Sequence, residues 1–86
     1  RIGLKRANFR NATGLYQPDH LMSARDLALL ARTIIREYPE YYPRFAQKEF
    51  LYRTHRFINR NPVLSTFPGA DGMKTGHLAE SGYGLV

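Results

Sequence analysis

Two short extended runs near the end of the chain, separated by a turn signal, constrain its fold most. The first spans residues 73–78 and the second residues 83–86, with Glu80-Ser81-Gly82 between them. Asp71-Gly72 is another turn signal, directly before the first run. The sequence therefore predicts an antiparallel hairpin over residues 73–86.

The first run contains a cation, a hydroxyl and a residue without a side chain in succession, Lys74-Thr75-Gly76. On a regular strand Lys74 and Gly76 face one side and Thr75 faces the other. Gly76 lets another backbone or a ligand approach closely. This combination suits a sheet edge that binds an anionic, peptide-like ligand. The alternative is a lysine beside a hairpin turn, because three common residues also recur by chance.

The clearest helix is predicted to begin after Ser23 and to end before Pro39. Ser23 is a suitable N-cap, and Asp26 brings a carboxylate to the positive end of the helix dipole. Apolar residues then recur at three- and four-residue steps. They are Leu27, Leu30, Ala31, Ile34, Ile35 and Tyr38. We expect this stripe to pack into a core, with a basic helix on nucleic acid or a membrane as the alternative.

The other segments predict short elements. Residues 1–22 are rich in turn formers and are expected to be irregular, with His20 in a structural role because no second ligand stands at metal-site spacing. Residues 39–45 predict a short helix with Pro39 in its first turn. Two strands are expected over residues 48–52 and 55–58, followed by a polar break at residues 59–61 and an apolar anchor.

Size and charge limit what the chain can do. Its 86 residues allow one domain or part of one, and the start at Arg1 without a methionine favours a piece of a longer protein. The net charge is +6, and Lys74 is the single basic residue after Asn61. This charge suits nucleic acid, anionic lipid or an acidic wall polymer, or an ordinary solvated surface. The absence of cysteine excludes disulfides and thiolate chemistry.

Three stretches together carry a family resemblance. The run Asp71-Gly-Met-Lys-Thr-Gly-His77, followed by Gly82-Tyr-Gly-Leu-Val86, resembles the third motif region of the low-molecular-weight penicillin-binding proteins, the D-alanyl-D-alanine carboxypeptidases. Phe9-x-Asn11-x-x-Gly14-Leu15 resembles the loop before a long helix in that family, and Asn59-Arg60-Asn61 also fits. The resemblance implies an α+β fold class. Residues 1–86 would then be a single partial domain of the β-lactamase/transpeptidase-like fold, with an incomplete antiparallel sheet.

The resemblance also implies roles for individual residues. Lys74 would be catalytic and would hold the substrate carboxylate electrostatically, and Thr75 would donate its hydroxyl to the same carboxylate. Gly76 would let the substrate backbone lie along the strand. The backbone N–H of His77 would form part of the oxyanion hole. Because Thr75 and Lys74 face opposite sides of a regular strand, a twist at Gly76 or a contact over the strand edge is expected.

The implied activity is that of a serine D-Ala-D-Ala carboxypeptidase. Such an enzyme trims peptidoglycan stem peptides through an acyl-enzyme, is acylated by β-lactams, and uses neither a cofactor nor a metal. The resemblance implies a bacterial, extracytoplasmic location, in the periplasm or on the outer face of the cytoplasmic membrane. Membrane association would come through segments outside this chain, and no nucleic acid is expected as a partner.

Two motifs of the family are missing from this sequence. Ser23, Ser65 and Ser81 are followed at the third position by residues other than lysine, and none heads a Ser-x-Asn element. We therefore expect the nucleophile, its base and the Ser-x-Asn element to lie upstream of Arg1, and the isolated fragment to be inactive. The alternatives are a serine β-lactamase fragment, disfavoured by the missing Glu-x-x-Leu-Asn-type element, or a non-enzymatic basic module that binds nucleic acid or an anionic polymer.

Overall fold

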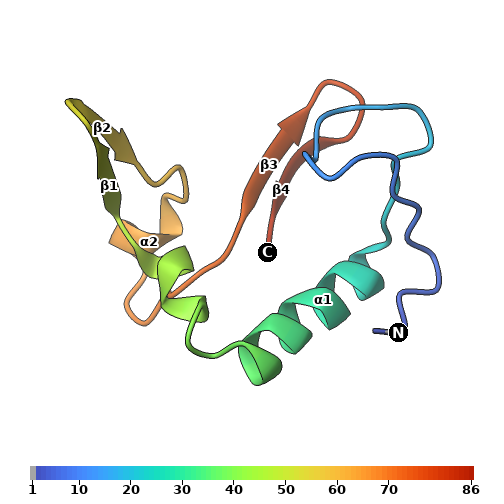
Figure 1. The fold of residues 1–86 in the computed structure, drawn as a ribbon, viewed down its shortest axis with the longest axis horizontal. Helices are drawn as coiled ribbons and strands as arrows, with labels where there is room; N and C mark the ends of the chain where they lie inside the picture. The colour runs from blue at the N-terminus through green and yellow to red at the C-terminus, as the bar shows by residue number, and fades with distance from the viewer. Residues whose placement is uncertain (1) are drawn as a thin grey trace. The chain divides into compact units, whose positions relative to one another are not determined.

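A computed structural model describes residues 2–86 as two compact units, the first ending at Tyr38 and the second comprising Pro39–Val86 (Figure 1). The first unit holds the helix α1, Ala24–Glu37. The second holds, in order, the 3₁₀ helix η1 (Tyr42–Ala46), β1 (Glu49–Tyr52), β2 (His55–Ile58), the short helix α2 (Val63–Thr66), β3 (Thr75–Leu78) and β4 (Gly82–Leu85). No helix within residues 2–86 has the length and apolar character needed to cross a membrane.

Helix α1 begins and ends where the sequence predicts. The Ser23 hydroxyl accepts a hydrogen bond from the Asp26 N–H at 3.1 Å, which satisfies one of the free donors of the first turn. The Tyr38 N–H donates to the Ile34 carbonyl at 3.0 Å, and Pro39 follows. The predicted cap and the predicted stop are therefore confirmed.

The Asp26 carboxylate also ties the preceding loop to the start of α1. It is only 2% exposed, and it accepts a hydrogen bond from the Arg6 N–H at 2.7 Å. A bridge of two backbone hydrogen bonds joins Asn8 and Leu21, at 2.8 and 2.9 Å. Residues 2–22 otherwise contain neither helix nor strand, as predicted.

No residue of the apolar stripe of α1 is fully buried, so the described residues do not form the core expected along this helix. Three residues of the stripe, Leu27, Ile35 and Tyr38, are 38%, 45% and 52% exposed. The other three, Leu30, Ala31 and Ile34, are half-buried. Leu64 of α2 is the one hydrophobic residue that is buried within residues 2–86. A chain of this size buries little apolar surface, because it supplies too few elements to cover the helix.

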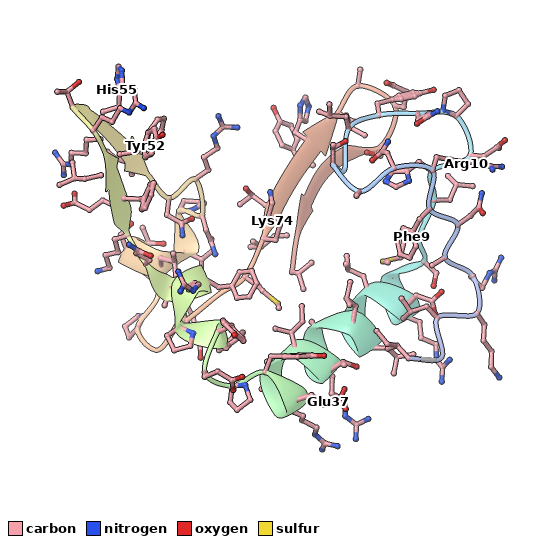
Figure 2. The ribbon with its side chains drawn as sticks, in the orientation of Figure 1. Phe9, Arg10, Glu37, Tyr52, His55 and Lys74 are labelled. Atoms are coloured by element: carbon pink, nitrogen blue, oxygen red, sulfur yellow. The ribbon has the colours of Figure 1, made fainter. Side chains whose placement is uncertain are left out.

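Both predicted strand pairs form, as separate two-stranded antiparallel sheets rather than as one sheet. Tyr52 pairs with His55 beside the tight turn of β1 and β2, and Figure 2 labels both at that end of the hairpin. Thr75 pairs with Leu85 in β3 and β4, so β3 begins two residues later than expected. The α+β class is correct, whereas the two strand pairs are not joined into one incomplete antiparallel sheet within the described residues.

Three local expectations are corrected. The short helix begins at Tyr42 with Pro43 in its first turn, rather than with Pro39 there. The segment after the polar break forms the helix α2, where only an apolar anchor was expected. The Asn61 side chain accepts a hydrogen bond from the Val63 N–H at 3.0 Å and so starts the helical turn. The turn before β3 lies at residues 67–70, where Gly69 follows Pro68 and has φ +88°, rather than at Asp71-Gly72.

Candidate functional site

One edge of β3 has no strand partner within residues 2–86. Lys74 and Val86 exchange two backbone hydrogen bonds, at 3.4 and 3.0 Å, so they form a bonded pair just before β3. Bonded and non-bonded pairs alternate along an antiparallel ladder. Gly76 therefore bonds toward β4, whereas the N–H and C=O groups of Thr75 and His77 point to the open edge.

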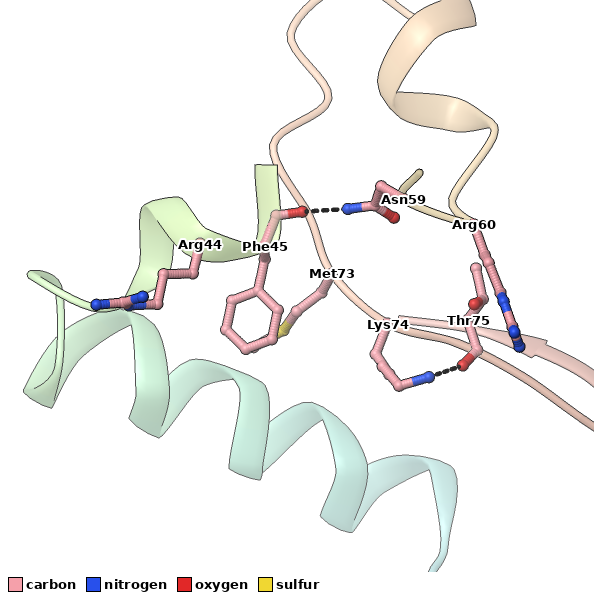
Figure 3. A pocket seen from close by; sticks show the side chains of 7 residues that line it. All are labelled: Arg44, Phe45, Asn59, Arg60, Met73, Lys74 and Thr75. Atoms are coloured by element: carbon pink, nitrogen blue, oxygen red, sulfur yellow. Dashed lines mark hydrogen bonds between the residues drawn. The ribbon is translucent and has the colours of Figure 1, made fainter. Parts of the chain in front are cut away.

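The Lys74 side chain lies at this same edge. It is exposed, and its ammonium group donates a hydrogen bond to the Thr75 carbonyl oxygen (Figure 3). The ion pairs of the described residues, Arg10–Asp19 and Arg56–Glu49, do not involve Lys74. The ammonium group is therefore held by a neutral acceptor that a carboxylate can replace.

Lys74 and Thr75 contribute to one pocket of about 380 Å³ at the beginning of β3. Thr75 is half-buried in it, and Lys74 is exposed. The seven lining residues, drawn in Figure 3, are Arg44, Phe45, Asn59, Arg60, Met73, Lys74 and Thr75. They include three cationic side chains and no carboxylate, so the pocket suits an anionic group. Neighbouring residues thus share a pocket although a regular strand would direct their side chains to opposite faces.

His77 and Gly76 complete the strand. The His77 ring lies against Tyr83, its partner on β4, with ring centroids 4.0 Å apart and planes inclined by 34°. The imidazole is therefore engaged on one face of the hairpin while the His77 N–H stays at the open edge. A Cβ placed on Gly76 would contact nothing within 4 Å. The backbone around Gly76 is consequently open to close approach.

The residues that hold the segment leading into β3 were not predicted from the sequence. The Asn61 side-chain amide donates to the Gly72 carbonyl oxygen at 2.7 Å, and the Tyr42 hydroxyl donates to the Asp71 carboxylate at 3.0 Å. Burial and the bond to Asp71 raise the pKa of Tyr42 above its ordinary value of 10.0. The one available signal was Asn61 directly before Pro62, a combination typical of a helix start.

Two of the three serines of the chain take part in local structural hydrogen bonds. Ser23 caps α1, and the Ser65 hydroxyl donates to the Pro62 carbonyl oxygen at 3.2 Å. No group of three or more His, Cys, Asp or Glu side chains among residues 2–86 is arranged to hold a metal ion. His20 has the structural role expected of it, because its Nδ1 accepts a hydrogen bond from the Arg10 N–H at 2.9 Å.

Residues 1–86 match the protein family described as D-alanyl-D-alanine carboxypeptidase. The chain belongs to this family. The chain is 41% identical over 87 residues to D-alanyl-D-alanine carboxypeptidase DacA of Haemophilus influenzae, covering 100% of this chain and 22% of that protein. It is 40% identical to DacA of Escherichia coli, covering 99% of this chain and 21% of that protein. DacF of Bacillus subtilis is 32% identical, and the match covers 99% of this chain and 23% of that protein.

A solved structure has the same fold over this region. Penicillin binding protein 5 from Haemophilus influenzae matches 98% of this chain and 25% of its own, with a TM-score of 0.92 and 41% identity. The resemblance to the penicillin-binding carboxypeptidases is thereby confirmed. The chain spans about a fifth of the length of the curated relatives it matches.

Proposed function

We propose that this chain is part of a bacterial, extracytoplasmic serine D-Ala-D-Ala carboxypeptidase that trims peptidoglycan stem peptides. Residues 1–86 would be a partial domain of a transpeptidase-like fold. The nucleophilic serine, its lysine and the Ser-x-Asn element would lie in a part of the protein outside this sequence. β-Lactams would acylate the same serine. Membership of the carboxypeptidase family and the geometry of β3 support this function.

The observation that carries the proposal is the open edge of β3 beside Lys74. An extended peptide adds to such an edge through backbone hydrogen bonds, and the Thr75 and His77 groups that face it are suited to that pairing. Gly76 leaves room for the added backbone. We assign the free C-terminal carboxylate of the peptide to the pocket that Lys74 and Thr75 line.

Each residue then has a physical role. The Lys74 ammonium would exchange the Thr75 carbonyl for the ligand carboxylate, and a hydrogen bond to a charged group contributes about 1.5–3 kcal/mol. Thr75 would donate its hydroxyl to the same carboxylate. The His77 N–H would donate to the oxyanion that forms when serine attacks the carbonyl of the penultimate D-alanine. The terminal D-alanine would leave as a protonated amine, and water would hydrolyse the ester.

Labelling with a fluorescent penicillin tests the proposal. The full-length protein should become covalently labelled, and Lys74→Ala should slow the labelling by about 10-fold or more, equivalent to the charge-assisted bond that is lost. Lys48→Ala is the matched control, because Lys48 is also exposed and does not line the pocket. The isolated 86-residue chain should not be labelled.

Two results would contradict this function. If the full-length protein is not labelled at all, the proposed reaction through a serine acyl-enzyme is excluded. Equal labelling rates for Lys74→Ala and Lys48→Ala would exclude a carboxylate-binding role for Lys74.

A further inference from the structure

Two hydrogen bonds hold the segment that precedes Lys74. The Asn61 amide donates to the Gly72 carbonyl oxygen at 2.7 Å, and the Tyr42 hydroxyl donates to the Asp71 carboxylate at 3.0 Å. Gly72 is two residues before Lys74, so the backbone that carries the lysine is fixed just before it enters the pocket. Both tethers come from residues far along the chain, 11 and 29 positions away.

Asn61 is itself fixed by hydrogen bonds. It is 3% exposed, and its Oδ1 accepts from the Val63 N–H at 3.0 Å in the first turn of α2. Its backbone N–H donates to the Asn59 side-chain oxygen at 2.9 Å. Because the oxygen of the amide is committed to Val63, the amide nitrogen is directed to Gly72. The side chain is therefore a rigid link rather than an adaptable surface contact.

Asn59 connects this link to η1 and to the residues between η1 and β1. Its side-chain nitrogen donates to the Phe45 and Gln47 carbonyl oxygens, at 3.3 and 2.9 Å, and its N–H donates to the Lys48 carbonyl oxygen at 2.9 Å. Figure 3 shows the bond from Asn59 to Phe45 at the wall of the pocket. One side of the pocket and the segment leading to Lys74 are thus parts of a single hydrogen-bonded network.

We propose that Asn61, supported by Tyr42, is a positioning residue for Lys74 and Thr75. This inference rests on the proposed function. The bonded pair with Val86 holds Lys74 from the β4 side, and Asn61 holds the segment from the α2 side. Without the Asn61 amide, the Gly72 peptide gains freedom and Lys74 and Thr75 lose their fixed positions. A displacement of about 1 Å at a ligand-positioning group is enough to cost on the order of 100-fold in rate.

The test compares Asn61→Ala with the wild type in the full-length enzyme. Acylation is measured with a fluorescent penicillin and with its methyl ester, which lacks the free carboxylate. Rates are counted per active site, from the final extent of labelling. We expect Asn61→Ala to slow acylation by the acid about 10-fold or more, and acylation by the ester by less than about 3-fold. The preference for the free carboxylate therefore falls.

A purely structural role gives a different result. It would reduce the fraction of protein that can be labelled but leave the rate per active site and the preference for the acid unchanged. Either that result, or an equal slowing of acid and ester, would overturn the proposal. Asn8→Ala is the matched control, because the exposed Asn8 amide also donates to a backbone carbonyl, that of Asp19, at 2.7 Å. It should leave both rates as in the wild type.

Tyr42→Phe keeps the proposal testable if Asn61→Ala does not fold. This variant removes the hydroxyl bond to Asp71 and keeps the ring, so it should lower the preference for the acid by about 2- to 5-fold. An unchanged preference would then overturn the proposal. Wild-type protein that is not labelled would instead refute the proposed function itself, so the two failures are distinguishable.

Discussion

Replacing Gly72 by alanine tests how tightly the segment before Lys74 is packed. A Cβ at this position would lie 2.8 Å from the Tyr42 hydroxyl oxygen, 3.4 Å from Tyr42 Cζ and 3.7 Å from Phe45 Cβ. The first distance is well inside an ordinary van der Waals separation, whereas the other two are close to it. The Tyr42 ring cannot retreat freely, because its hydroxyl is bonded to Asp71. Gly72→Ala must therefore displace the ring or the segment.

The expected cost follows from these contacts. Forcing a methyl group into a filled site typically destabilises a protein by about 1–3 kcal/mol. In a Tyr42→Phe background the 2.8 Å contact disappears and the nearest remaining atom is 3.4 Å away. Gly72→Ala should then cost less than about 0.5 kcal/mol. The two substitutions should consequently be coupled by about 1–2 kcal/mol.

Urea unfolding of the full-length protein measures this coupling. The wild type, the two single variants and the double variant form a complete cycle, and penicillin labelling reports on the site in each of them. An equal loss of unfolding free energy on Gly72→Ala in both backgrounds, or no loss in the wild type, would show that the Tyr42 hydroxyl does not crowd this position.

Three further predictions concern single side chains. Ser23→Ala should destabilise the protein by about 1 kcal/mol in urea unfolding, because the N-cap bond to α1 is lost, whereas Ser65→Ala at an exposed hydroxyl should cost less. The raised pKa of Tyr42 means that its contribution to stability is complete below pH 10 and is lost as the pH rises through the raised value. Above pH 10 the unfolding free energy of Tyr42→Phe should therefore fall less steeply with pH than that of the wild type. Equal pH profiles for the two proteins would count against this. Thr75→Val should slow penicillin acylation by about 10-fold and Thr75→Ser by less than about 3-fold, and equal effects would exclude a hydroxyl role.

Local signals in the sequence predicted most of the secondary structure. Ser23 and Pro39 fixed the ends of α1 because capping and proline effects act within one turn. The alternating runs predicted all four strands, with boundaries displaced by at most two residues. Helix α2 was missed because its start depends on the Asn61 side chain, and four residues are too few to show a helical period.

The supports of the candidate site could not be predicted from local patterns. Lys74, Thr75 and Gly76 stand together in the sequence, so their chemistry could be identified directly. Tyr42 and Asn61 reach the same region only through the fold, since neither is near Asp71 or Gly72 in the chain. The exposure of the α1 stripe also depends on which elements are present to cover it rather than on the helix itself.

The most direct measurement for the whole account is the structure of the full-length protein acylated by a penicillin. We expect the acyl oxygen to accept a hydrogen bond from the His77 N–H within about 2.7–3.1 Å, the distance typical of an oxyanion hole. The ligand carboxylate should contact Thr75 and Lys74. A strand of the protein itself paired along the open edge of β3, with the ligand bound elsewhere, would contradict it.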